Sequence, residues 1–256
     1  MRSLSASELL TVWEQGLTQS WVQRGLNLLA LAHPDRSREQ LAHVSIGDRD
    51  RHLFRLRESL FGSQFASVVD CPACGDRLEL NFSTDDILLP PAINASDTVT
   101  AMIENYEVQF RLPTSFDLVA LGNQTVNQTV NQTVNQTDAE LLQRQLLEQC
   151  LLQIQQDNVT VSVEELSPST IMAITTAMAQ VDPQADVELA LSCPACQHDW
   201  QAPFDIVSFF WSELQSWAQR LLRDTHVIAS AYGWSEAEIL AMSGQRRSLY
   251  LEMIGK

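Results

Sequence analysis

The sequence predicts an α+β fold that is mostly helical and surrounds a two-hairpin, zinc-ribbon-like core, with an inserted α/β segment. The tetrapeptide Cys-Pro-Ala-Cys occurs at 71–74 and again at 193–196, with 118 residues between the two copies. Strand-like alternation flanks each copy, and helical periodicity dominates both ends of the chain. Two CxxC pairs supply the four thiolates of a structural zinc site. The long gap therefore predicts an insertion that leaves this module and returns to it.

Residues 1–62 are predicted to form an N-terminal helical region. A capping box begins at Ser5, and a second apolar stripe runs from Trp21 until Pro34 stops it. The clearest helix opens at Ser45 and ends near Gly62, a residue suited to the end of a helix. The charged side chains of this helix are interpreted as a solvated, locally paired face, with a docking surface for an acidic partner as the alternative. Its arginines are Arg49, Arg51, Arg55 and Arg57.

The predicted module is split between residues 63–82 and 187–204. In each half one strand leads into the CxxC turn and a second strand leads out of it. The residue that follows the second cysteine commonly needs a positive φ. Gly75 adopts such a φ without a Cβ penalty, whereas Gln197 at the equivalent position would do so at a cost of about 1 kcal/mol.

Residues 83–186 are predicted to form the inserted acidic segment. Alternation at Glu107–Leu112 indicates a strand that turns into a short helix, and a further helix is expected from Asp138 to about Gln155. Ser167 and the proline after it indicate the start of another helix. Residues 122–137 largely repeat the tetrapeptide NQTV and are expected to form a disordered surface loop.

Residues 205–256 are predicted to form a C-terminal aromatic helical region. Asp205 is expected to cap its longest helix, whose apolar residues step alternately by three and four, like a heptad seam. Such a seam packs either on the chain's own core or on a helix of a partner. The candidate partner-binding residues are Phe210, Trp211, Leu214, Trp217, Trp234 and Tyr250.

Charge and composition restrict the class of partner. The formal net charge is −16, and residues 78–219 hold 19 acidic side chains but only Arg111 and Arg144 as bases. Nucleic-acid surfaces need a positive footprint, so a nucleic-acid partner is not expected. The N-terminus lacks the apolar stretch of a signal peptide, and the strongly apolar run Ile206–Trp211 is too short to span a bilayer. A cytoplasmic protein without a membrane partner is therefore expected.

The cysteines carry the candidate chemistry. In a reducing compartment paired cysteines bind metal more often than they form disulfides, and we interpret the two pairs as ligands of one structural zinc per chain. His198 could replace one cysteine; a redox dithiol and a metal-free relic of a ribbon are the alternatives. The lone Cys150 is expected to pack as a small hydrophobic residue. The predicted ligands are Cys71, Cys74, Cys193 and Cys196.

No second arrangement of chemical groups stands out. The five histidines form no HExxH pattern, and the sequence has neither a glycine-rich phosphate loop nor a G-x-S-x-G motif. We therefore expect no enzymatic activity and no small-molecule substrate.

Several segments, taken in order, resemble one family. The combination resembles the baseplate hub assembly chaperones of T-even-type phages, which have relatives in bacterial contractile injection systems and phage-tail-like particles. The NQTV stretch departs from this pattern as an expanded loop. The segments are Ile46–Asp50, Leu56–Gly62, CPACGDRLEL, Phe110–Thr114 with Asp117-Leu118, CPACQHDWQAPFDIVSFFW, and the tail from His226 to Ile254.

The resemblance implies a non-enzymatic part in building a baseplate, with other baseplate or hub proteins as partners. It implies a place in the bacterial or phage-infected cell or in the assembled particle, and it supports the four paired cysteines as metal ligands. A zinc-ribbon adaptor in bacterial regulation is the alternative function, followed by a CxxC thiol oxidoreductase.

Overall fold

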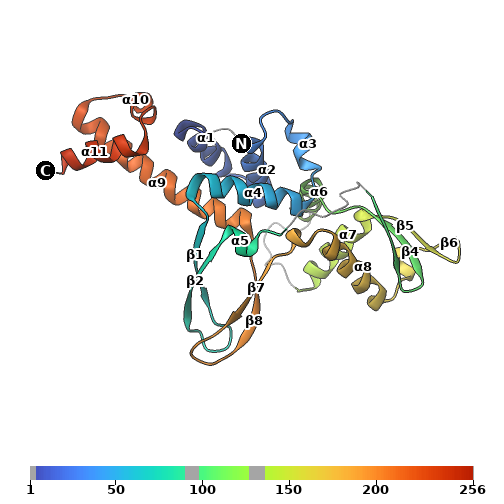
Figure 1. Cartoon of the computed structure of the whole chain (residues 1–256). Coiled ribbons are helices and arrows are strands. Elements are labelled where there is room, and N and C mark those ends of the chain that lie inside the picture. The colour runs from blue at the N-terminus through green and yellow to red at the C-terminus, as the bar shows by residue number, and fades with distance from the viewer. Residues whose placement is uncertain (1–3, 90–97, 127–135, 256) are drawn as a thin grey trace. The chain divides into compact units, whose positions relative to one another are not determined.

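The computed structural model describes residues 4–89, 98–126 and 136–255, with side chains described outside residues 123–140 (Figure 1). The fold is mixed α+β and mostly helical, with small antiparallel sheets, which confirms the predicted fold class. None of the helices in the described part of the chain has the length and apolar character that crossing a membrane requires.

The chain divides into two compact units. The first joins residues Met1–Asp35 to Ile206–Lys256, and the second is the continuous stretch Arg36–Asp205. The first unit is helical, and its other helices pack on the long helix α9. Leu10, Ala218 and Leu221 form a small buried core there. Its helices are α1 (Ala6–Gly16), α2 (Trp21–Ala32), α9 (Ile206–Tyr232), α10 (Glu236–Leu240) and α11 (Gly244–Ile254).

The heptad-like seam of α9 is buried in the folded chain. Phe210, Trp211 and Leu214 are buried, and the Trp211 ring lies so close to Gly16 that a Cβ there would overlap it. The guanidinium of Arg24 covers the same ring, 4.7 Å from its centroid. Because these three side chains are buried in the folded chain, their assignment to a partner-binding surface is corrected.

The second unit contains the two hairpins. Both are antiparallel, and in each the last strand pair is followed by a six-residue turn that contains the CxxC motif, between Asp70 and Arg77 and between Ser192 and Asp199. The two hairpins thus have the same construction although they are far apart in sequence. Their strands are β1 (Gln64–Asp70), β2 (Arg77–Ser83), β7 (Glu188–Ser192) and β8 (Asp199–Pro203).

The inserted segment forms a four-stranded antiparallel sheet in the order β3-β4-β5-β6. Its core includes Val108 and Phe110 of β4, Ile154 of β5, Leu147 of α7 and Ile174 of α8. The strands are β3 (Val99–Ile103), β4 (Tyr106–Phe110), β5 (Leu151–Gln156) and β6 (Val159–Thr160). The helices of the second unit are α3 (Arg38–Ala42), α4 (Ile46–Phe61), α5 (Thr84–Ile87), α6 (Ser115–Val126), α7 (Gln136–Cys150) and α8 (Pro168–Val181), with the 3₁₀ turns η1 (Val163–Glu165) and η2 (Pro183–Ala185).

The helix expected from Asp138 to about Gln155 is shorter than predicted. It ends at Cys150, and the chain continues directly as β5, where Ile154 pairs with Val108 across the sheet. Cross-strand pairing and burial of Ile154 override the apparent helical spacing of this stretch. Of the loop expected at 122–137, residues 127–135 lie outside the described residues, and the neighbouring residues belong to α6 and α7.

Two of the α4 arginines are buried, which contradicts the expectation that they face solvent. The Arg57 guanidinium donates to the carbonyls of Gly62 (2.7 Å) and Gln64 (2.8 Å), and it lies 3.9 Å from the centroid of the Phe65 ring. It thereby satisfies carbonyls where α4 ends and β1 begins. The second arginine, Arg49, donates from Nε to its neighbour Asp50 at 2.6 Å.

Candidate metal centre

The two CxxC turns, here called knuckles, have matching backbone geometry. In both, the amide after the second cysteine donates to the carbonyl of the first cysteine at 2.8 Å. The amide of the first cysteine donates to a carbonyl on the other side of the turn. For Cys71 the acceptor is the Asp76 carbonyl at 2.8 Å, and for Cys193 it is the His198 carbonyl at 2.9 Å. The residues after the second cysteines have φ of +75° at Gly75 and +58° at Gln197, which confirms the positive φ predicted for both.

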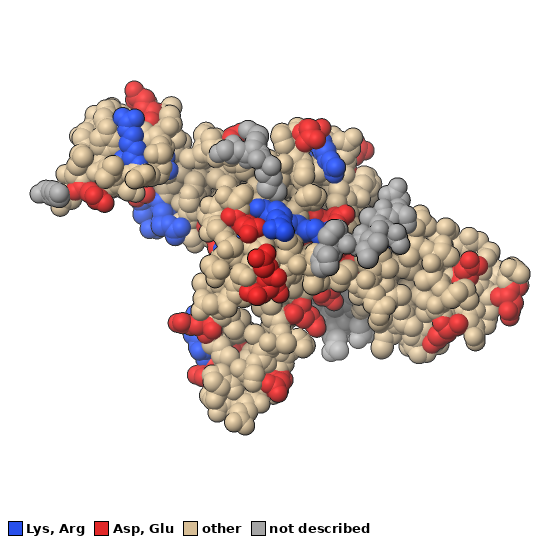
Figure 2. All heavy atoms as spheres, viewed as in Figure 1, with Lys and Arg blue, Asp and Glu red and all other residues tan. Residues whose placement is uncertain are grey.

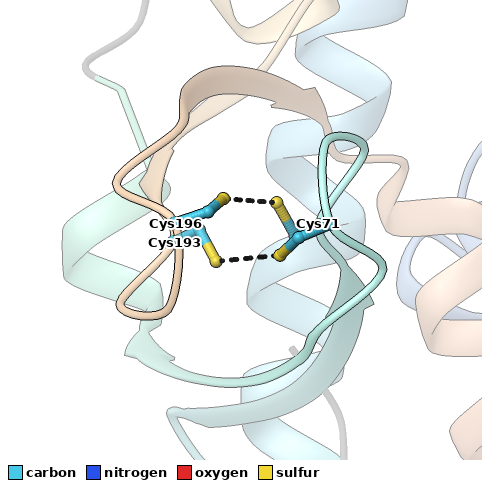
Figure 3. Close-up of side chains that lie close together, drawn as sticks. Cys71, Cys193 and Cys196 are labelled. Atoms are coloured by element: carbon cyan, nitrogen blue, oxygen red, sulfur yellow. Dashed lines mark hydrogen bonds between the residues drawn. The ribbon is translucent and has the colours of Figure 1, made fainter.

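The four predicted ligands converge at one point. The Sγ atoms of Cys71 and Cys196 lie 3.7 Å apart, as do those of Cys74 and Cys193, and all four sulfurs lie within 4.8 Å of one another. Figure 3 shows the sulfurs of the two knuckles facing each other. Zn–S bonds of about 2.3 Å in a tetrahedron place sulfurs about 3.8 Å apart. The thiols therefore fit a tetrahedral zinc ion, and four thiolates would leave no open position for substrate.

An aromatic cluster holds the other ends of the hairpins. The rings of Phe65 on β1 and Phe82 on β2 stack with centroids 4.9 Å apart, and Phe204, just after β8, meets Phe82 edge-on at 5.5 Å. Phe54 on α4 stacks on Phe204 at 6.0 Å. Edge-on and offset pairs of this kind add to the free energy of burial. The hairpins are thus joined by rings at their bases and by thiols at their tips.

The thiols differ in acidity. Burial of the Cys71 thiol opposes ionisation, but the amides of Cys74 and Ala73 and the neighbouring thiols lower its pKa to about 7. For Cys74, the Asp76 amide lowers the pKa, whereas the Cys196 thiol, burial and the other two thiols raise it to about 12. Without a cation the cluster therefore keeps protons near neutral pH. A divalent metal would displace them, because only thiolates bind zinc.

The other sequence candidates lie apart from this cluster. Among the described residues, the four cysteines are the group placed to hold a metal ion, and His198 instead stacks on Trp200 with centroids 5.9 Å apart. Cys150 is fully buried, and burial raises the pKa of its thiol to about 11, as expected for a packed, unreactive residue. Trp217 is half-buried against the core of the first unit.

Trp234 and Tyr250 belong to an aromatic cluster of the first unit that the sequence did not predict as a cluster. The Tyr232 ring stacks on Trp234 with centroids 4.7 Å apart, and the Tyr250 ring meets Trp234 edge-on at 4.8 Å. The cluster connects the end of α9 to α11. Leu249 and Met253 on α11 are exposed beside it in sequence. The positions of Leu249, Tyr250 and Met253 do not follow a regular helical spacing of apolar residues. The sequence pattern therefore gave no sign of the aromatic cluster.

The unequal residues after the knuckles give a matched pair of substitutions. We expect Gln197→Gly to stabilise the zinc-loaded protein by about 1 kcal/mol, because it relieves a left-handed backbone conformation. The equivalent change in the first knuckle, Gly75→Ala, should destabilise it by a similar amount. Urea unfolding of both variants measures the two effects. Equal stability of Gln197→Gly and the unmodified chain would show that the turn carries no such strain.

The comparisons with known proteins give one family. A family model described as T4 bacteriophage base plate protein matches residues 26–211, which include both knuckles and the whole inserted segment. The tail from His226 to Ile254, which contributed to the resemblance drawn from the sequence, lies beyond the matched residues. No curated protein and no solved structure matches the chain.

Proposed function

Because the chain belongs to the T4 bacteriophage base plate protein family, we propose that it is a non-enzymatic assembly factor or component of a baseplate hub, stabilised by one zinc ion. The four-cysteine cluster carries this proposal. It joins two distant segments of the matched region, so its natural role is to fix a shape that other proteins recognise. A closed shell of four thiolates is suited to structure and not to catalysis.

The zinc ligands in this proposal are Cys71, Cys74, Cys193 and Cys196. The ion would close a loop of more than a hundred residues, whose conformational entropy otherwise favours the unfolded chain. The rings pack only at the bases of the hairpins, so they do not tie the two knuckles to each other at the tips. The metal would supply that orientation.

The partner surface in this proposal lies on the last helices. Tyr232, Trp234 and Tyr250 form an aromatic cluster, and the Arg246 guanidinium lies 5.7 Å from the centroid of the Tyr250 ring. Aromatic and arginine side chains are enriched where binding energy concentrates at protein interfaces. α11 buries none of its residues in the chain's own fold, and Met253 is 62 % exposed. The proposed partner is another baseplate protein.

This surface can be tested without removing a helix. Truncation after Asp224 would cut α9, which continues to Tyr232 and buries Ile228. We instead expect Tyr250→Ala combined with Met253→Ser to weaken co-purification with neighbouring baseplate proteins at least about tenfold, since hot-spot side chains contribute 2 kcal/mol or more, roughly. The matched control is Met172→Ser, which alters an equally exposed methionine on α8. Undiminished capture by the double variant would refute this surface.

The thiol oxidoreductase alternative lacks a supporting geometry. Low-pKa CxxC cysteines are favoured by the N-terminus of a helix, whereas each knuckle here lies between two strands of a hairpin. Catalytic reduction of a dithiol substrate by the purified chain would nevertheless overturn the non-enzymatic assignment.

A further inference from the structure

A cavity of about 740 Å³ in the second unit is lined by both charged and aromatic side chains. It lies between the α3–α4 region and the stretch that joins β4 to α6, and five of its lining residues are basic or aromatic. Figure 2 shows separate acidic side chains on the visible face of the inserted sheet, whereas the cavity is lined by two arginines and two aspartates. The five are Arg36, His43, His52, Arg111 and Phe116.

Arg36 is the arginine of the cavity lining that the lining aspartates do not pair with. Asp117 pairs with Arg111 through two contacts of 2.7 Å, and Asp48 pairs with Arg51. Both carboxylates that line the cavity are thus engaged by arginines. Arg36 is exposed, and within the described residues it forms no ion pair. Its guanidinium is therefore available to a negative ligand.

Two stacked rings line the same cavity as Arg36. The His43 ring stacks on the Phe116 ring with centroids 4.8 Å apart and planes inclined by 28°. Phe116 is 53 % exposed although it is a large apolar side chain. Its free surface can cover an apolar or aromatic group that enters the cavity next to a carboxylate.

Hydrogen bonds join the two backbone segments that line the cavity between these groups. Ser45 and Thr114 form an antiparallel bridge, and the Ile46 amide donates to the Pro113 carbonyl at 3.0 Å. The buried carboxylate of Asp117 accepts from the Thr114 amide (2.9 Å) and hydroxyl (2.8 Å) as well as from Arg111. Arg111 and Asp117 thus neutralise each other and fix this side of the cavity before any ligand arrives, which lowers the entropic cost of binding.

We propose that this cavity binds an acidic peptide segment of a partner protein, with a carboxylate on Arg36 and the adjacent apolar side chain against the His43–Phe116 stack. Guanidinium groups recognise carboxylates through paired, charge-assisted hydrogen bonds. A peptide is favoured over a free small anion because Arg36 and Phe116 are both solvent-exposed at the cavity, where a chain can continue outward. This site goes beyond the proposed surface on α11 and requires no residue of that helix.

The test is selection from a random dodecapeptide library on the full-length, zinc-loaded protein, followed by affinity measurement for the selected peptides. We expect a consensus with Asp or Glu next to an aromatic or large aliphatic residue. Arg36→Ala and Phe116→Ala should each weaken binding about tenfold or more, since both alter exposed side chains that the fold does not need. The control Arg38→Ala removes an equally exposed arginine two residues away that does not line the cavity.

Two results would overturn the proposal. One is a selection whose peptides bind Arg36→Ala and Phe116→Ala as tightly as the unmodified chain. The other is displacement of the selected peptides by inorganic phosphate at similar affinity, which would identify a free oxyanion as the ligand. Selection on the Tyr250→Ala protein should return the same consensus, which separates failure of this site from failure of the α11 surface.

Discussion

Replacing Cys71 and Cys193 by serine is expected to abolish zinc binding and to release the two knuckles from each other. The unmodified chain should carry about one zinc per molecule, and the double variant should carry none. We expect the free energy of unfolding to fall by about 5 kcal/mol or more. Metal analysis and urea unfolding of the same preparations measure both effects.

The size of this effect follows from what the metal holds together. Apparent zinc-binding energies of about 10–16 kcal/mol in small zinc peptides become folding energy when the empty site does not form. Here the rings of Phe54, Phe65, Phe82 and Phe204 already hold the hairpin bases, so part of the structure persists without metal. The expected loss is therefore smaller than the full binding energy but still comparable to the stability of a typical domain.

The fifth cysteine provides the control. Cys150→Ala changes a fully buried thiol outside the cluster, so it should cost some packing energy and leave the zinc content unchanged. A metal-free unmodified chain that is as stable as the zinc-loaded one would contradict the structural role of the site. Loss of zinc in Cys150→Ala alone would place the metal elsewhere.

Local patterns in the sequence predicted the two CxxC knuckles of the four-cysteine cluster well, because the geometry of each knuckle is set within a few residues. Each CxxC turn has a positive φ at the residue after its second cysteine, which Gly75 indicates directly and Gln197 shares only through its equivalent place in the repeated motif. Alternation predicted the strands on either side. What joins the hairpins at their bases was not visible, since Phe54 and Phe204 meet only in the folded chain.

Burial was the property that the sequence predicted least well. A seam with heptad-like steps looks the same whether it packs on the chain's own helices or on a partner, and Phe210 and Leu214 of α9 are buried in the folded chain. Similarly, a charged residue on an amphipathic helix is expected to face solvent. Arg57 is instead buried because it satisfies backbone carbonyls at the end of α4, a demand that arises from tertiary structure.

Gly47→Ala is expected to destabilise the second unit strongly, although it adds only one methyl group. Gly47 lies in the first turn of α4, where its amide donates to the buried carboxylate of Asp182 at 2.9 Å. A Cβ on Gly47 would overlap that carboxylate. The variant must move Asp182, which loses a hydrogen bond, or displace the helix. Overpacking costs about 1–3 kcal/mol and a buried charge-assisted hydrogen bond about 1.5–3 kcal/mol.

We therefore expect Gly47→Ala to lower the free energy of unfolding by about 3 kcal/mol, or Tm by roughly 10 °C, measured on zinc-saturated protein. The control Gly122→Ala alters a helical glycine whose Cβ would meet no described atom within 4 Å. It should be neutral or slightly stabilising, because alanine favours helix. Similar losses in both variants would mean that the close approach of Asp182 is not the cause.

A double-mutant cycle with Asp182→Ala isolates that cause. Burial raises the pKa of Asp182, while the hydrogen bond from the Gly47 amide opposes the shift, so the carboxylate is held in place at an energetic cost. Once the carboxylate is removed, a methyl group on residue 47 has space, and most of the penalty of Gly47→Ala should disappear. Additive losses would instead indicate that the helix start itself cannot accept a side chain. The cycle thus tests whether the glycine in this segment is required by a residue 135 positions away in the chain.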